Sequence, residues 1–249
     1  MRSSFWILIP AMLTGLFLLT ACEDEDLAPT NPLDMPYEVV IDPADFIDSD
    51  ITGNEFFPIT PGSTYVYLGE DEDGEAVRVE EEHTTDTKVI MGITCVVVNA
   101  REFVDGEPVE NTYDWYAQDT QGNMWYFGEH SEEIEDGQVV GTGGSWEAGV
   151  DGALPGIIML AHPIEGLWYR QEYYEGEAED VAQVLSLSAT VDVPYGNGTF
   201  TNCLQTAEWN PMEPEIMEHK FYASGVGLLR AVAVKGESGY EDLVSITSD

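Results

Sequence analysis

Asp-Gly pairs recur along the chain between runs that are rich in Val, Thr and Tyr. They include the pairs at 105–106, 136–137 and 151–152. Such a pair readily adopts the positive φ angles of a tight turn, so it favours a hairpin of two antiparallel strands. The runs at 63–68 and 89–100 have the β-branched and aromatic composition of strands. Since no long amphipathic helix pattern accompanies them, we predict a mainly β fold of antiparallel sheets or a curved half-barrel.

The second half of the chain repeats the order of short segments found in the first half. Small insertions suffice to align five pairs: 63–67 with 166–170, 74–76 with 176–178, 92–96 with 200–204, 114–117 with 220–223, and 124–126 with 228–230. A shared order of this kind indicates an internal duplication. We therefore predict two related β halves, 54–158 and 159–249.

The charge of the chain is strongly negative. Asp and Glu number 48 against 8 Lys and Arg, a formal net charge of −40. This excess excludes nucleic acid as a partner, because the phosphates would be repelled. Two explanations compete for it: a solvated surface adapted to high salt, or the binding of divalent cations. The acids are spread along the chain, which favours the solvated surface.

The first 21 residues have the order of a signal peptide. Arg2 precedes an uncharged run over 5–20, which is shorter than the roughly 20 residues of a membrane-spanning helix. The run ends at Leu19-Thr20-Ala21-Cys22, which resembles the bacterial lipobox. That resemblance implies cleavage before Cys22 and attachment of lipid to it, which would anchor the protein outside the cytoplasmic membrane, at the outer membrane or cell surface. The alternative is an uncleaved anchor with an incidental cysteine.

Residues 22–53 are expected to form a disordered, flexible, acidic tether. They contain several prolines and lack a sustained hydrophobic period. Beyond Cys22 the chain has two further cysteines, Cys95 and Cys203. An exported compartment permits a disulfide between them. The alternative is two buried free thiols in equivalent strands.

An apolar segment at 152–160 joins the two halves, with aromatic residues near it in the sequence. A pocket of apolar and aromatic side chains between two halves is a common ligand site. The predicted groove consists of Trp146, Leu154, Ile157, Ile158, Met159, Leu160 and Trp168. The alternative is ordinary core at the seam between the halves.

Other chemistry has less support in the sequence. Asp71 and Asp73 resemble the opening of a calcium loop, but strand-like flanks favour a hairpin turn. The four histidines lack zinc-ligand spacing, and no nucleophile elbow or phosphate loop is present. We therefore assign no catalytic residue and expect no cofactor.

Three stretches, 114–129, 145–159 and 219–229, resemble segments of a family of uncharacterised bacterial lipoproteins. This resemblance covers a minor part of the chain and implies no activity. The lipidated antiparallel arrangement is also loosely similar to periplasmic carriers of the LolA/LolB type, which hold acyl chains in an open β half-barrel. As a fold-level analogy, this implies a carrier of a hydrophobic ligand.

Together these features predict an anchored, non-catalytic binding domain for a hydrophobic small molecule or an envelope protein. A carboxylate-dependent hydrolase is one alternative, and it requires acids with raised pKa in one cleft. A calcium-stabilised structural lipoprotein is the other alternative.

Overall fold

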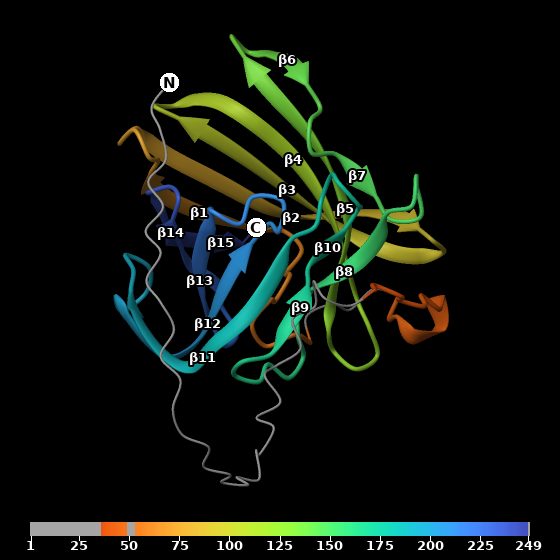
Figure 1. Ribbon diagram of the computed structural model, residues 1–249. Helices are drawn as coiled ribbons and strands as arrows, with labels where there is room; N and C mark the ends of the chain where they lie inside the picture. The colour runs from red at the N-terminus through yellow and green to blue at the C-terminus, as the bar shows by residue number, and fades with distance from the viewer. Residues whose placement is uncertain (1–35, 49–52, 249) are drawn as a thin grey trace, which may run out of the picture.

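The computed structural model describes residues 36–48 and 53–248, which form one continuous antiparallel sheet of fifteen strands (Figure 1). Cys22 and the expected signal peptide lie outside these residues. Within them the helical segment is the short 3-10 helix η2 (Pro43–Asp45), and no helix is long and apolar enough to cross a membrane. The strands are β1 (Ser63–Glu70), β2 (Ala76–Ile90), β3 (Ile93–Val104), β4 (Glu107–Gln118), β5 (Met124–Glu135), β6 (Gln138–Gly141), β7 (Trp146–Glu147), β8 (Leu154–Met159), β9 (Trp168–Arg170), β10 (Glu172–Tyr173), β11 (Val181–Asp192), β12 (Thr199–Trp209), β13 (Met217–Ala223), β14 (Gly227–Lys235) and β15 (Tyr240–Ser248).

Two meanders make up the sheet. Strands β1 to β5 pair in chain order, as do β11 to β15, and β1 pairs with β15 to join the two series. The predicted mainly β, antiparallel and curved architecture is confirmed. The duplication of the two halves stays a prediction, and the expected boundary at residue 158 falls inside β8.

The two ends of the sheet meet in one short segment. Strand β9 pairs with β11 at one end, and β10 pairs with β8 at the other. Only Gln171 separates β9 from β10. The backbone N–H groups of Gln171 and Glu172 both donate to the carbonyl of Asp180, at 2.8 and 3.2 Å. The segment 168–173 therefore belongs to both ends and nearly closes the sheet into a barrel-like shape.

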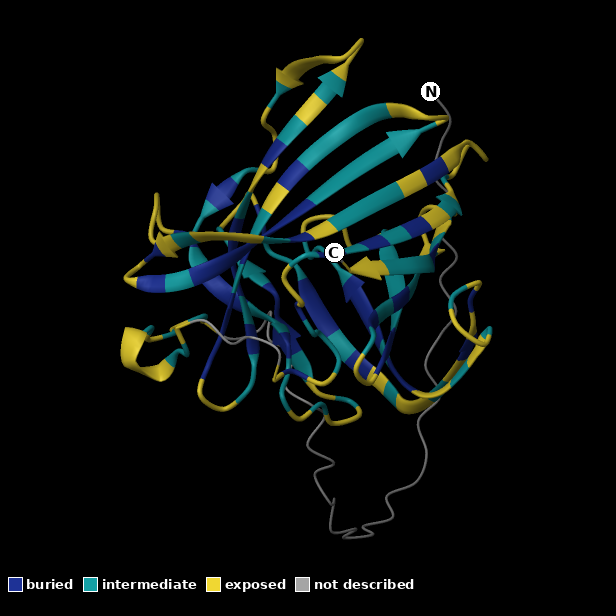
Figure 2. Ribbon diagram, turned by 180° about the vertical axis from the view of Figure 1, so that it is seen from behind, coloured by how far each residue is buried: buried dark blue, intermediate teal, exposed yellow. Residues whose placement is uncertain are grey.

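The predicted turns are confirmed. Asp105, Asp136 and Asp151 all have φ near +50°, and each is followed by a glycine with positive φ. Glycine and Asp tolerate this conformation better than most residues, which explains the recurrence of the pair. All three of these Asp-Gly pairs are exposed. Figure 2 shows exposed residues at many turns and buried residues along the strands.

Residues 36–48, which belong to the predicted tether 22–53, contact the sheet. Phe46 packs edge-on against Trp125 and Phe127, with ring centroids 5.9 and 5.6 Å apart. The Tyr37 hydroxyl donates to the Pro155 carbonyl at 2.7 Å. Apolar side chains among the prolines and acids thus anchor this stretch to the sheet.

The core lies on both faces of the sheet. Strand β3 is buried on both faces over its first part, with Cys95 on one side and Val96 and Val98 on the other. Cys95 and Cys203 are buried free thiols in separate core clusters, so the possible disulfide between them is not formed. Burial raises the pKa of Cys95 to about 12, which keeps it a protonated, unreactive thiol.

Gly156 is placed where the sheet closes. A Cβ at this position would lie 2.2 Å from the carbonyl oxygen of Gln171. We expect Gly156→Ala to lower the free energy of unfolding by about 1–3 kcal/mol, because β8 and the closing segment must separate. Urea denaturation measures the loss. The control is Gly141→Ala, where the Cβ meets the flexible end of Glu133 instead. Equal midpoints for the two variants would contradict this role of Gly156.

Candidate ligand site inside the sheet

A cavity of about 180 Å³ lies between opposite walls of the sheet. Strands β1, β2 and β4 line one side, and β13 and β14 line the other. Strands β2 and β4 are several positions away from β13 in the sheet order, so the cavity lies inside the curve of the sheet. Its wall is largely aromatic and aliphatic, and includes Phe57, Tyr65, Tyr67, Tyr116, Ile158, Tyr222 and Leu228.

Lys220 on β13 is the cation of this interior. Its Nζ lies 3.1 Å from Glu208 Oε2 and 3.7 Å from Glu218 Oε2. Burial alone would lower the pKa of Lys220, but the carboxylates of Glu208 and Glu218 outweigh it and raise the pKa. Lys220 therefore stays charged. Its side chain lines three adjoining cavities.

Glu208 on β12 has a full set of donors. Its Oε1 accepts from the Thr206 hydroxyl at 2.6 Å and the Tyr222 hydroxyl at 3.1 Å. Its Oε2 accepts from the Gln171 side chain at 3.1 Å. Burial alone would raise the pKa of Glu208, but Lys220 and these hydrogen bonds lower it. Because Gln171 lies in the closing segment, this network ties the closure of the sheet to the interior ion pair.

A second cavity, of about 410 Å³, adjoins the first and shares Lys220 and Leu228 with it. Its lining is strongly acidic and includes Glu102, Glu218 and Glu241. Burial, followed by the charges of Glu102 and Glu218, raises the pKa of Glu241 to about 7. The acids at this end therefore lack enough positive charge to balance them.

Further acids face the other end of the interior. Burial, followed by the charge of Asp180, raises the pKa of Glu172 well above its usual range. Burial also raises the pKa of Asp180, although Lys220 opposes the shift. Asp180 lines a cavity of about 170 Å³ together with Glu208 and Lys220. The interior is thus acidic on either side of the Lys220–Glu208 ion pair.

His83 on β2 is held in one tautomer. The backbone N–H of Thr60 donates to its Nδ1 at 3.0 Å, so this nitrogen must be unprotonated. The proton is then on Nε2, which donates to Glu81 Oε1 at 2.8 Å. The ring also stacks on Tyr65 with centroids 4.6 Å apart. These contacts fix His83 and Glu81 in the cavity wall.

Tyr126 lies between two carboxyl groups. Its hydroxyl oxygen is 2.6 Å from Asp114 Oδ1 and 2.6 Å from Glu129 Oε2. A phenol has one proton to donate, so both short contacts require a second proton on one carboxyl group. Burial raises the pKa of Asp114 well above its usual range and also raises that of Glu129. This trio can therefore hold a shared proton.

The predicted groove residues do not line one groove. Ile157, Ile158, Met159 and Leu160 pack in one core cluster. Ile158 also packs against a second cluster and, alone of these four, reaches the interior cavity. The other three are apart from it: Leu154 pairs with Tyr173, Trp168 packs edge-on against Trp209, and Trp146 packs edge-on against Tyr126. Most of the junction segment, residues 154–159, forms β8, a strand within the sheet.

Asp71 and Asp73 lie in the turn between β1 and β2. The Oδ1 atom of Asp71 accepts from the backbone N–H groups of Asp73 and Glu75, at 3.0 and 2.8 Å. Among the described residues no group of three or more His, Cys, Asp or Glu side chains could hold a metal ion. The turn is thus stabilised by its own carboxylate.

No family model and no curated protein matches the chain. A Bacteroides fragilis NCTC 9343 protein, named as exported and as having a YMCC-like fold, aligns with a TM-score of 0.45 and 16% identity, over 78% of this chain and 100% of its own. A Parabacteroides distasonis ATCC 8503 protein named as a lipoprotein aligns with a TM-score of 0.41 and 13% identity, over 78% of this chain and 99% of its own. Both similarities are too low to transfer the role of any residue.

The ion pair gives a first test of the interior. We expect Lys220→Met to lower the free energy of unfolding by about 3–5 kcal/mol, because it leaves the buried Glu208 carboxylate without its cation. The double variant with Glu208→Gln should recover much of that loss. A double-mutant cycle by urea denaturation measures the coupling. A Lys220→Met variant as stable as the wild type would contradict the charged pair.

Glu241 gives a test by pH. The folded protein binds its proton more tightly than the unfolded chain, so its contribution to stability is full below pH 4.5 and is lost as the pH rises through about 7. We expect Glu241→Gln to remove a cost on the order of 3 kcal/mol at pH 8 and to change little at pH 4. Thermal unfolding at both pH values measures this.

The control for this test is Glu237→Gln, an exposed acid of the same cavity rim. It should leave the melting temperature nearly unchanged at both pH values. A Glu241→Gln variant that is no more stable than Glu237→Gln at pH 8 would contradict the buried, uncompensated carboxyl group.

Proposed function

We propose that this chain is a membrane-anchored extracytoplasmic lipoprotein, held by lipid on Cys22, with a non-catalytic binding domain. We further propose that its interior binds a small hydrophobic molecule that carries a positive charge. The observation that carries this proposal is the junction of an aromatic cavity and an acidic cavity at Lys220 and Leu228. An envelope protein is the alternative partner.

The aromatic cavity suits the hydrophobic part of such a ligand. Tyr65, Tyr67, Tyr116 and Tyr222 face it from both walls, with Leu228 where it meets the acidic cavity. Burying apolar ligand surface here contributes about 25 cal/mol per Å². Tyrosine rings also attract a nearby cation through their negative faces, which favours a ligand with a positive charge.

The acidic cavity suits the charged part. Lys220 is its one basic side chain among the described lining residues, and it already pairs with Glu208. Glu102, Glu218 and Glu241 are left without an equal positive charge. A bound cation would relieve their mutual repulsion and lower the raised pKa of Glu241. Binding near pH 7 should therefore release protons.

We expect octylamine to bind more tightly than octanol, and octanol more tightly than octanoate. Isothermal titration calorimetry in two buffers of different ionisation enthalpy measures both affinity and proton release. Leu228→Gln should weaken octylamine binding about tenfold, a loss of 1.4 kcal/mol, because this side chain joins the two cavities. The matched control is Leu187→Gln, at an exposed leucine of β11. Octanoate binding as tightly as octylamine would overturn the charge preference.

A carboxylate-dependent hydrolase is the second candidate, and the Asp114–Tyr126–Glu129 contact favours it. Acid–base hydrolysis needs one carboxyl group protonated and another ionised, and the shared proton of this trio supplies that state. Glu129 also lines a cavity that opens on the outer side of the sheet. A protein that only binds its ligand does not need such a proton. Recovery of the ligand unchanged after incubation would therefore support a binding domain, and recovery of hydrolysis products would support a hydrolase.

A further inference from the structure

An outer cavity of about 530 Å³ lies on the other face of β3 and β4 from the interior. Val97, Tyr113 and Trp115 line it from these strands, and Trp146 and Glu147 line it from β7. Successive side chains of a strand point to opposite faces, so Tyr113 and Trp115 point away from Asp114 and Tyr116. Tyr116 lines the interior cavity, and the outer cavity is therefore a separate site.

Lys88 and Glu147 form an ion pair in the outer cavity, which Glu129 also lines. The Nζ atom of Lys88 lies 2.7 Å from Glu147 Oε2 and 3.2 Å above the ring centroid of Trp115. Lys88 is one of three lysines in the chain, and its placement beside Glu147 leaves this pair with no net charge. A charged ligand would have to break the pair, so a neutral ligand is favoured.

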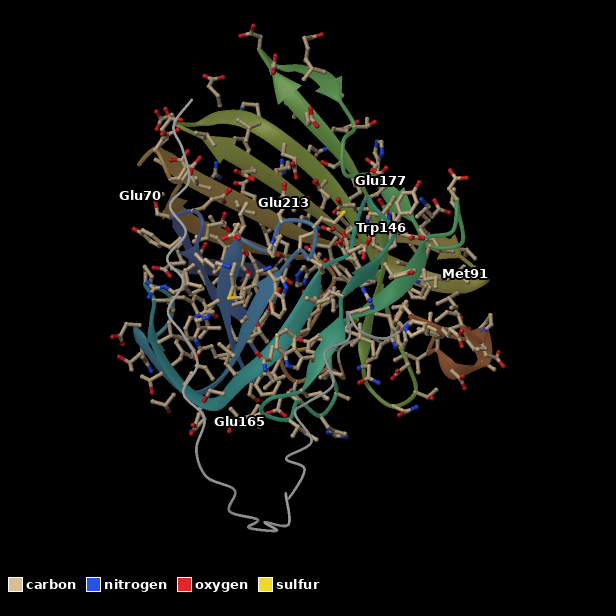
Figure 3. The ribbon with its side chains drawn as sticks, viewed as in Figure 1. Glu70, Met91, Trp146, Glu165, Glu177 and Glu213 are labelled. Atoms are coloured by element: carbon tan, nitrogen blue, oxygen red, sulfur yellow. The ribbon has the colours of Figure 1, made fainter. Side chains whose placement is uncertain are left out.

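Trp146 supplies a donor that has no acceptor. The residue is 5% exposed, and its indole N–H has no hydrogen-bond partner among the described residues. Leaving such a buried donor unpaired is costly, and an acceptor on a ligand would remove that cost. Trp146 is labelled in Figure 3, in the region where β5 pairs with both β7 and β8.

Gly128 on β5 places Trp146 at this wall. Its φ is +113°, and a Cβ there would lie 2.2 Å from the Trp146 carbonyl oxygen. The missing side chain lets β7 pair closely with β5. The position of the unpaired indole is thus fixed by the backbone.

We propose that the outer cavity binds a neutral sugar ring. A sugar ring has an apolar C–H face that can lie on the exposed ring of Tyr113, which is 38% accessible. Its hydroxyl groups can accept from the Trp146 indole and the Lys88 ammonium, and donate to the Glu129 and Glu147 carboxylates. A neutral molecule with donors and acceptors around an apolar face can contact these aromatic, donor and acceptor groups at the same time. This proposal does not depend on the interior ligand site.

The test uses the methyl glycosides of glucose, galactose, mannose and N-acetylglucosamine. Saturation-transfer NMR detects binding, and titration gives the dissociation constant. At least one glycoside should bind at millimolar concentration, and its affinity should fall about tenfold in Tyr113→Ala and severalfold in Trp146→Phe, which keeps a ring but removes the donor. Tyr240→Ala, an equally exposed tyrosine elsewhere, is the control and should bind as the wild type does.

Two outcomes would overturn the proposal. One is that none of the four glycosides binds to the folded wild type. The other is that Tyr113→Ala and Trp146→Phe bind as tightly as Tyr240→Ala. Tyr113 is a surface residue, so its variant should fold, and a thermal midpoint for each variant separates lost binding from lost structure.

Discussion

The segment 168–173 connects the two ends of the sheet, and the rest of the molecule depends on that connection. Antiparallel sheets that stay open leave unpaired backbone groups along both edges, whereas closure removes them. Here one short stretch of chain pairs with β11 through β9 and with β8 through β10. The closure defines an inside and an outside, so it decides which side chains meet across the interior. Gln171 at its centre also donates to Glu208, so the same segment supports the interior network.

The interior combines two demands that usually conflict. A closed β domain is expected to fill its centre with apolar side chains, yet here acids from several strands face one another across it. Glu208 is ionised because Lys220 and three neutral donors surround it. Within residues 36–48 and 53–248 no comparable set of donors surrounds Glu172 or Glu241, and burial raises their pKa values. The cavities beside them therefore have an electrostatic preference for positive charge.

Much of the fold follows from local sequence, and much of the site does not. The Asp-Gly turns and β-branched runs predict antiparallel hairpins, because both depend on the conformations of neighbouring residues. The role of Lys220 depends on pairing across β12 and β13, which local sequence leaves open. The sequence offers one signal for this role. Lys220 is one of only three lysines, and it is two residues from Tyr222, so both side chains lie on the same face of their strand. Phe46 has no comparable local signal, because prolines and acids surround it. The apolar composition of 152–160 suits either a groove or core at the seam, and residues 154–159 of it form β8.

Strand β1 pairs with β15 over most of its length, from Ser63 opposite Ser248 to Glu70 opposite Tyr240. This pairing joins positions separated by nearly the whole described domain, and contacts of such separation form late in folding. Until Tyr240–Ser248 is present, β1 and β14 each keep an unpaired edge. A chain shortened at its C-terminus would therefore expose two strand edges that could pair with strands of other molecules. This would happen even though the cavity residues that precede β15 in the sequence are all still present.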